Sequence, residues 1–195
     1  QLDNAELDLG GHTEALFCGA DLVVMSPGVP ELSATRAARA AGVEVIAEIE
    51  LAYRFLHPDV TLIAITGTNG KSTTTALVHH VLESAGLPVR MGGNIGLPIL
   101  SQAPLPSGGV YVLELSSYQI DIMHTLACDA AALINLSPDH LDRYDGYEGY
   151  MASKARLFEM QTGHETSVFG KGDTDTERVC RDVLTRRGAE FVHLA

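Results

Sequence analysis

One glycine-rich segment, set between an apolar strand pattern and a helix pattern, limits the possible folds of this chain more than any other feature. The apolar run 62–65 leads into Thr-Gly-Thr-Asn-Gly-Lys-Ser-Thr-Thr at positions 66–74. The helix pattern that follows is expected to carry four apolar residues on one face, Leu77, Val78, Val81 and Leu82. A buried strand that turns through glycines into a helix is a phosphate-binding unit of parallel sheets, so the segment predicts an α/β fold.

Phosphate binding is the chemistry that this segment favours. Gly67 and Gly70 let backbone N–H groups turn inward around phosphate oxygens, and the start of the helix adds its positive dipole. Lys71 adds a full charge, and the hydroxyl of Ser72 can bind Mg²⁺. An ordinary turn would also use glycines, but it needs no lysine and hydroxyl in succession at a helix start. The residues predicted to bind phosphate are Gly67, Thr68, Asn69, Gly70, Lys71, Ser72, Thr73 and Thr74, which are the ATP-binding residues if the nucleotide is ATP, as the resemblance given below implies.

The rest of the chain alternates short apolar runs with helix patterns, which is typical of a mostly parallel sheet with helices on both faces. A break at His57-Pro58-Asp59 predicts a boundary between a unit 1–57 and a unit 58–195. Strands are expected at 22–25, 43–47, 60–65, 89–91, 110–115, 130–136, 166–169 and 191–193. Helices are expected at 32–41, 48–55, 72–85, 147–160 and 174–187. The second unit is therefore predicted to be a P-loop ATPase-type sheet.

The first unit has too few strands to close a sheet by itself. Because the chain also begins with Gln1 rather than methionine, we expect this unit to be the C-terminal part of a Rossmann-like domain that starts earlier.

Charge and composition favour small-molecule partners. A formal net charge of -12 opposes binding to nucleic acid or to an anionic membrane, and the sequence has no apolar stretch or basic leader that predicts membrane insertion. The cysteines, Cys18, Cys128 and Cys180, form no CxxC pair, so neither a zinc site nor a disulfide framework is indicated. A cytoplasmic protein is expected.

Glu114 is a candidate metal ligand because it follows the apolar run 110–113. Ligands of open α/β sheets bind at the carboxyl ends of the strands, so Glu114 should face the same crevice as Lys71. Carboxylate oxygens suit Mg²⁺. A lone glutamate at a strand end could equally be a helix cap or a solvated group, and the pairing with the phosphate loop is what favours a metal.

Four further segments, taken with the loop, resemble one family, the Mur ligases. They are Ser26-Pro27-Gly28-Val29-Pro30, Gly92-Gly93-Asn94-Ile95-Gly96, Glu114-Leu115-Ser116-Ser117-Tyr118-Gln119 and Asp139-His140-Leu141-Asp142-Arg143-Tyr144. The resemblance covers about residues 21–160 and is closest to the members that add D-glutamate. It implies three domains: a UDP-substrate domain to which 1–57 would belong, a central ATP-binding domain at 58–195, and an amino-acid-binding domain absent here. The chain by itself would then be inactive.

The resemblance also implies a reaction and the residues that carry it. The family uses ATP to join UDP-N-acetylmuramoyl-L-alanine to D-glutamate through an acyl phosphate, in bacterial peptidoglycan synthesis. Lys71 would neutralise the transferred phosphate. Ser72, Thr73 and Glu114 would hold a first Mg²⁺, and His140 would be a catalytic residue that binds a second Mg²⁺ and the substrate.

Further substrate contacts follow from the same resemblance. Asn94 and Ser116 would contact the substrate, and Ser26 and Gly28 would belong to the UDP-sugar site. Ser-Pro-Gly and Asn-Ile-Gly also form turns in proteins that bind nothing, so turn chemistry is the alternative for these residues.

Lys154 is a candidate catalytic residue and metal ligand. It falls within the apolar helix stripe of Met151, Ala155 and Phe158, so its side chain is expected to point inward. Burial lowers the pKa of a lysine and leaves some neutral amine, which can react with CO₂. The family segment that 151–159 resembles carries a carbamylated lysine, which would supply an anionic oxygen to Mg²⁺. The alternative is a lysine whose stem covers apolar surface while its amine reaches water.

Two other functions share part of this pattern. A small-molecule kinase would have the phosphate loop and Glu114 but would not need the segment 116–119 or a buried lysine after His140. A nucleotide-binding module without catalytic activity is the second alternative.

Overall fold

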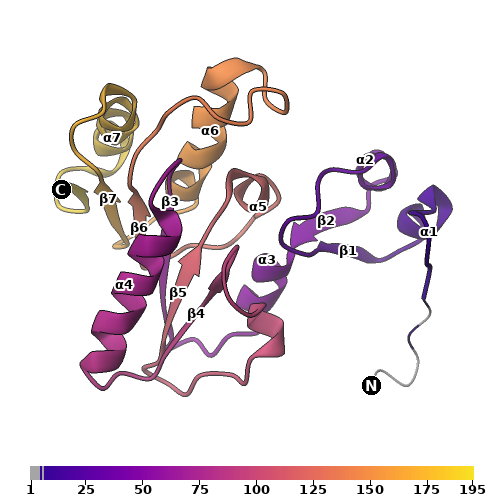
Figure 1. Ribbon diagram of the computed structural model, residues 1–195, viewed down its shortest axis with the longest axis horizontal. Coiled ribbons are helices and arrows are strands. Elements are labelled where there is room, and N and C mark those ends of the chain that lie inside the picture. The colour runs from indigo at the N-terminus through magenta and orange to yellow at the C-terminus, as the bar shows by residue number, and fades with distance from the viewer. Residues whose placement is uncertain (1–4, 6) are drawn as a thin grey trace.

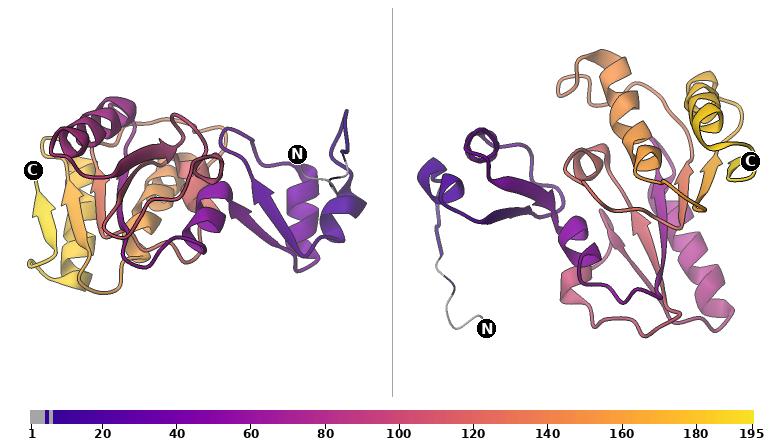
Figure 2. Two further views of the ribbon diagram at one scale, coloured as in Figure 1. Left: turned by 90° about the horizontal axis from the view of Figure 1, so that it is seen from below. Right: turned by 180° about the vertical axis from the view of Figure 1, so that it is seen from behind.

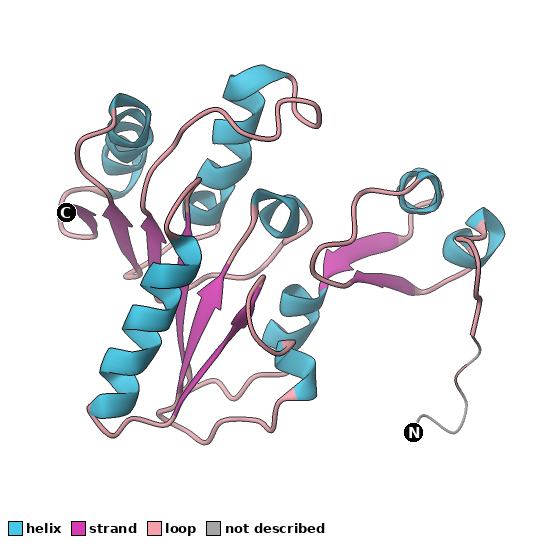
Figure 3. Cartoon of the chain, viewed as in Figure 1, coloured by secondary structure: helices cyan, strands magenta, loops and turns pink. Residues whose placement is uncertain are grey.

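The described part of the protein contains two parallel sheets, one of two strands and one of six (Figure 1). The computed structural model describes Ala5 and residues 7–195, so residues 1–4 and 6 of the predicted first unit lie outside the described part. Helices and strands alternate along the chain (Figure 3). The predicted α/β fold is therefore confirmed. Among the described residues, every helix is too short or too polar to span a bilayer.

The smaller sheet pairs β1 (Leu22–Met25) with β2 (Glu44–Ala47). Helices α1 (Glu14–Cys18) and α2 (Ser33–Ala40) accompany it. Its core is formed by Val23, Met25, Ala38 and Val45. The strands and α2 were predicted, whereas α1 was not, since its five residues are too few to show helical periodicity.

The larger sheet has the strand order β4-β5-β3-β6-β7-β8, and all its neighbours are parallel. Its strands are β3 (Thr61–Thr66), β4 (Val89–Gly93), β5 (Val110–Glu114), β6 (Ala130–Leu133), β7 (Thr166–Phe169) and β8 (Val192–Leu194). Successive residues of a strand face opposite sides, so Leu62 and Ala64 enter one core cluster and Ile63 and Ile65 the other. In this strand order β3, the strand that leads into the phosphate loop, lies in the middle of the sheet, between β5 and β6.

Helices cover both faces of this sheet, as expected (Figure 2). Helix α4 (Lys71–Ser84) packs on one face through Val78 and Leu82. The helices on the other face are α3 (Glu48–Tyr53), α5 (Ser117–Asp121), α6 (Gly146–Glu159) and α7 (Thr174–Arg187). Of the four apolar residues expected on one face of α4, the other two, Leu77 and Val81, remain 59% and 56% exposed. Residues next to each other are turned by about 100° around a helix, and the sheet covers only the Val78 and Leu82 side.

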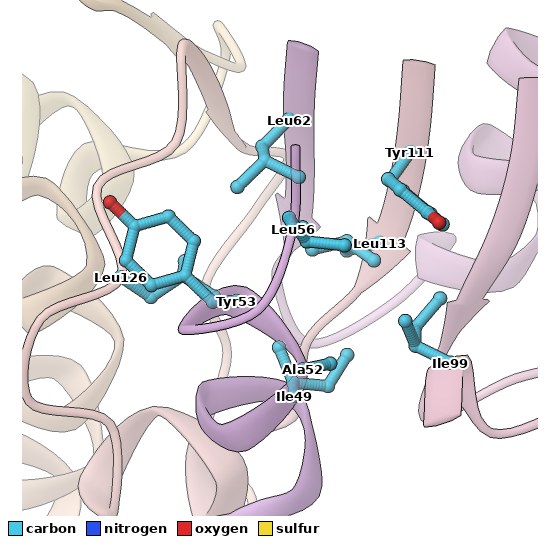
Figure 4. A pocket seen from close by; sticks show the side chains of 9 residues that line it. All are labelled: Ile49, Ala52, Tyr53, Leu56, Leu62, Ile99, Tyr111, Leu113 and Leu126. Atoms are coloured by element: carbon cyan, nitrogen blue, oxygen red, sulfur yellow. The ribbon is translucent and has the colours of Figure 1, made fainter. Parts of the chain in front are cut away.

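Helix α3 packs against the six-stranded sheet although it precedes the predicted boundary at residue 57, which stays a prediction. The contact leaves an apolar cavity of about 10 Å³ (Figure 4). It is lined by Ile49, Ala52, Tyr53, Leu56, Leu62, Ile99, Tyr111, Leu113 and Leu126. Ile99 comes from the short 3₁₀ helix η1 (Ile99–Ser101). A space of this size holds at most about one water, so it is a packing gap and not a ligand site.

Candidate active site

The phosphate loop lies between the end of β3 and the start of α4. Gly67 and Gly70 have φ values of 149° and 82°, which residues other than glycine rarely adopt. A Cβ on Gly67 would also lie 3.2 Å from the carbonyl oxygen of Asn135. The Lys71 Nζ donates to the carbonyl of Thr68 at 2.8 Å, which folds the cation over the loop. Ser72 and Thr73 are exposed in the first turn of α4.

The segment that follows β6 holds this loop. The Asn69 N–H donates to Asn135 Oδ1 at 2.8 Å, and Asn135 Nδ2 donates to the Asn69 carbonyl at 2.9 Å. The Thr68 hydroxyl donates to the Ser137 carbonyl and accepts from its N–H, at 3.1 and 3.0 Å. The side chain of Thr68 therefore already serves the loop itself. Sequence reasoning missed Asn135, whose signal was a polar residue inside the apolar run that the strand prediction carried to Leu136.

The predicted strand 130–136 was too long, because β6 ends at Leu133. Beyond it, the backbone turns to other partners: the Asn135 carbonyl accepts from the Thr68 N–H at 3.0 Å, and the Leu136 N–H donates to Asp173 Oδ2 at 2.9 Å. Asp173 also caps α7 through the N–H groups of Asp175 and Thr176. The strand stops where its hydrogen-bonding groups are needed to shape the site.

Glu114 stands at the carboxyl end of β5 and is 2% exposed. Its Oε1 accepts from Asn94 Nδ2 at 3.1 Å, while Oε2 is buried and has no hydrogen-bond partner among the described residues. A buried carboxylate oxygen without a partner is costly, so this atom fits a metal ion or a metal-bound water. No group of three His, Cys, Asp or Glu residues suited to a metal occurs in the described part of the chain. Mg²⁺ commonly completes its shell with hydroxyls, water and phosphate oxygens, so the residues present fit it.

A cavity of about 210 Å³ opens at the carboxyl ends of the strands. It is lined by Gly28, Lys71, Asn94, Ser116, Ser117, Tyr118, Asp139, His140, Tyr150 and Lys154. The fold thus brings predicted site residues from both sheets to one place. Ser26 is not among the lining residues and lies exposed two positions before Gly28. Glu114 also does not line the cavity, but it is hydrogen-bonded to Asn94, which does.

Lys154 points into the protein, as its place in the apolar stripe predicted. It is 2% exposed, its Nζ donates to Thr66 Oγ1 at 3.2 Å, and it lies 4.9 Å from the ring centre of Tyr150. Burial, reinforced by the positive charge of Lys71, lowers the pKa of Lys154 to about 7. A substantial fraction of this amine is therefore neutral at physiological pH.

His140 occupies a strained turn above the cavity. Its φ of 51° lies in the left-handed region, which costs a residue other than glycine on the order of 1 kcal/mol or more. The centre of the His140 imidazole ring is 5.0 Å from the centre of the Tyr118 ring. The Arg143 guanidinium stacks on the same Tyr118 ring, with its Cζ 3.9 Å from the ring centre. Aromatic and cation–π contacts thus hold the turn.

Ser116 is the N-cap residue of α5 and already has hydrogen-bond partners. Its hydroxyl accepts from the Gln119 N–H at 3.3 Å and donates to Gln119 Oε1 at 3.0 Å. This is a capping box, the one sequence signal that could have predicted this five-residue helix. Ser116 therefore has a local structural role as a helix cap, in line with the turn-chemistry alternative, and it also lines the cavity.

A sequence profile of the Mur ligase middle domain matches residues 65–194. The chain belongs to the Mur ligase family. It is 59% identical to a UDP-N-acetylmuramoylalanine–D-glutamate ligase of Novosphingobium aromaticivorans, over 98% of this chain and 42% of the relative. The corresponding ligase of Sphingopyxis alaskensis is 54% identical over 92% of this chain and 42% of its own length. This Mur ligase chain thus spans about 42% of the length of these relatives.

Solved structures of more distant Mur ligases share the fold. The UDP-N-acetylmuramate:L-alanyl-gamma-D-glutamyl-meso-diaminopimelate ligase of Neisseria meningitides has a TM-score of 0.58 at 22% identity, over 94% of this chain and 61% of that one. A MurF from Acinetobacter baumannii has a TM-score of 0.56 at 18% identity, over 88% of this chain and 44% of that one. At these identities the comparison supports the architecture alone.

Proposed function

We propose that this Mur ligase chain carries the ATP-binding part of an enzyme that joins UDP-N-acetylmuramoyl-L-alanine to D-glutamate. The observation that carries the proposal is the cavity in which Gly28, from the loop after β1, meets Lys71, His140 and Lys154. A ligase must bring a carboxylate substrate to the γ-phosphate of ATP, and this cavity joins the two required regions. The similarity to D-glutamate ligases supports the choice of substrates.

We assign the regions accordingly. Residues 1–57 would form part of the UDP-substrate domain, with Ser26 and Gly28 near the sugar nucleotide. Residues 58–195 would form the ATP-binding domain, with the phosphates on loop 67–74. Binding of D-glutamate would require parts of the protein that correspond to the remaining length of the relatives.

The proposed reaction has two steps. A carboxylate oxygen of the alanyl group attacks the γ-phosphorus, the bond to the bridging oxygen of the β-phosphate breaks, and ADP leaves. The amine of D-glutamate then attacks the acyl carbon, loses a proton and displaces phosphate. Phosphoryl transfer requires mainly positioning and neutralisation of charge, so Lys71 and the N–H groups of the loop would stabilise the transferred phosphate.

Mg²⁺ would lower the cost of bringing these anions together. Ser72, Thr73 and Glu114 are the proposed ligands of one ion, and the orphaned Oε2 of Glu114 supports that role. His140 and Lys154 are the proposed ligands of a second. Asn94 and Ser116, together with His140, would contact the substrate.

Lys154 would act as a carbamate. The lone pair of its neutral amine attacks the carbon of CO₂, a nitrogen–carbon bond forms, and the proton leaves to water. The lowered pKa and the burial of this amine support the reaction. The product carries an anionic oxygen group in place of the neutral amine.

The proposal is tested with the gene product that contains this chain, expressed at full length. Phosphate release from ATP should require both UDP-N-acetylmuramoyl-L-alanine and D-glutamate, and a ligated product should form in equal amount. Equal stimulation by L-lysine or diaminopimelate would point to another ligase of the family. Phosphate release without any amino acid substrate would favour a kinase or hydrolase instead.

A further inference from the structure

Three polar side chains from separate segments meet beneath the turn that carries His140. The Tyr144 hydroxyl donates to Asp121 Oδ2 at 2.8 Å, and the Ser153 hydroxyl donates to Asp121 Oδ1 at 2.6 Å. The two hydroxyl oxygens lie 3.2 Å apart. Asp121 is the last residue of α5, Ser153 lies on α6, and Tyr144 belongs to the connection between β6 and α6. One carboxylate therefore ties two later segments together.

Each of the two hydroxyl groups belongs to a residue that is close in sequence to a residue of the cavity. Ser153 precedes Lys154 on α6, and its hydroxyl also contacts the Ser117 carbonyl at 3.2 Å. Tyr144 closes the turn that starts at His140, because the N–H groups of Arg143 and Tyr144 point to the His140 carbonyl at 3.0 and 3.4 Å. Fixing both hydroxyls on one carboxylate fixes the position of His140 relative to Lys154.

The ring of Tyr150 lies close to both His140 and Lys154. Its centre is 6.2 Å from that of His140 and 4.9 Å from the Lys154 Nζ, and the ring of Tyr144 packs on it at 5.7 Å. The strained φ of His140 means that the turn needs an outside restraint to keep its shape. Burial raises the pKa of Tyr144 to about 12, so its hydroxyl remains a donor to Asp121.

We propose that Asp121 is a positioning residue of this site: through Tyr144 and Ser153 it holds His140 and Lys154 at a fixed separation across the cavity. Asp121 itself does not line the cavity. Its effect on turnover rests on the proposed ligase function, whereas its anchoring of the turn does not.

Hydrogen exchange tests the anchoring without any substrate. In the full-length protein, Asp121→Asn and Tyr144→Phe should make the amides of Arg143 and Tyr144 exchange about 10-fold faster, since each loses a hydrogen bond that restrains the turn. The matched control is Tyr147→Phe, which removes a hydroxyl that donates to Asp175 Oδ2 at 3.1 Å, on α7. The control should leave those amides unchanged. Equal exchange rates in all four proteins would overturn the proposal.

Kinetics test the consequence for the site. Loss of Asp121 or of the Tyr144 hydroxyl should lower kcat about 10-fold to 100-fold, as for other residues that orient catalytic groups. KM for ATP should stay within about 2-fold, because the phosphate loop is not touched. The double variant should lose no more than the more severe single variant, since both act through one contact. Multiplied losses, or a raised KM with normal kcat, would contradict this role. If the wild-type protein shows no ligase turnover, the proposed function fails and the exchange experiment still decides the anchoring.

Discussion

Two buried charged side chains in this protein have opposite surroundings. Glu50, on α3, is 0% exposed, and its carboxylate accepts hydrogen bonds from Arg54, from Thr125 and from the backbone N–H groups of residues 124–126. Lys154 is 2% exposed and makes one hydrogen bond, to Thr66, within the described part of the chain. The charge of Glu50 is therefore satisfied by hydrogen bonds within the protein, and that of Lys154 is not.

The pKa values follow this difference. Burial would raise the pKa of Glu50, but the hydrogen bonds from Thr125, His124 and Arg54 outweigh it and lower the pKa instead. Around Lys154 burial prevails, and the pKa falls to about 7. A buried charge with all its partners is destabilising to disrupt, whereas an unsatisfied one is kept at a cost in stability and indicates a site that a ligand or a chemical modification completes.

The largest expected effect is the loss of turnover in Lys71→Ala of the full-length protein. Removal of the cation from the phosphate loop should lower kcat for phosphate release by about 1000-fold or more. The melting temperature should change little, because among the described residues the amine makes one hydrogen bond, and that bond lies within its own loop. Steady-state kinetics and calorimetry measure the two quantities. Turnover close to that of the wild type would remove the loop from the mechanism.

Glu50→Gln should act mainly on stability, in contrast to Lys71→Ala, which acts mainly on turnover. We expect it to lower the free energy of unfolding by about 3 kcal/mol. The folded-state pKa of Glu50 is lowered, so its contribution is full above the unfolded value near 4.5 and is lost as pH falls through the folded value. The difference between wild type and variant in urea unfolding should therefore vanish in acid. Glu44→Gln is the control: Glu44 binds the same Arg54 from an exposed position, so its loss should lower the free energy of unfolding much less than Glu50→Gln does. Equal losses in the two variants would show that burial of Glu50 is not what matters.

Lys154→Met should stabilise the protein while abolishing turnover. The unfolded state binds a proton to Lys154 up to about pH 10.5, and the folded state only up to about pH 7. Wild-type stability therefore rises between these values, and the advantage of the methionine variant should be greatest below pH 7 and shrink toward pH 10. These melting curves should be recorded in buffers freed of CO₂. The exposed Lys171 offers the control Lys171→Met, for which no such gain is expected. A gain independent of pH would contradict the cost assigned to the buried amine.

Asn135→Ala should have the smallest of these effects. It removes two hydrogen bonds to the backbone of Asn69, at about 1 kcal/mol each, and should raise KM for ATP a few-fold through a looser loop. Asn69→Ala leaves both backbone groups in place, so its effect on unfolding should be smaller. Urea denaturation of the two variants makes the comparison, and a greater loss in Asn69→Ala would exclude the proposed role of Asn135.

The sequence predicted the parts of the fold that repeat. Long helices such as α6 and buried strands such as β5 carry many residues in one period, so their existence could be read directly. The same logic placed Lys154 inside the protein. Helices α1 and α5 were missed because five residues span only about one and a half turns, too few for an apolar repeat to show. The capping box of Ser116 was the signal for α5.

The site was predictable where it depends on topology. Parallel strands end at one edge, so residues after β3, β5 and β6 had to meet, and Lys71, Ser116 and His140 do line one cavity. What could not be predicted were contacts between distant segments, such as Asn135 with the phosphate loop. The hydrogen bonds of Asp121 belong to the same class, since they depend on how three elements pack.

A ¹³C NMR experiment on Lys154 tests the contrast between the two buried charges most directly. The full-length protein and its Lys154→Met variant are equilibrated with ¹³C-labelled bicarbonate at pH 8 in the presence of Mg²⁺. The wild-type protein should show a carbamate carbonyl signal that the variant lacks and that weakens as the pH is lowered toward 6, since the amine then becomes protonated. Identical spectra for the two proteins would contradict the carbamate, because Lys154 would then be a buried amine that no modification completes.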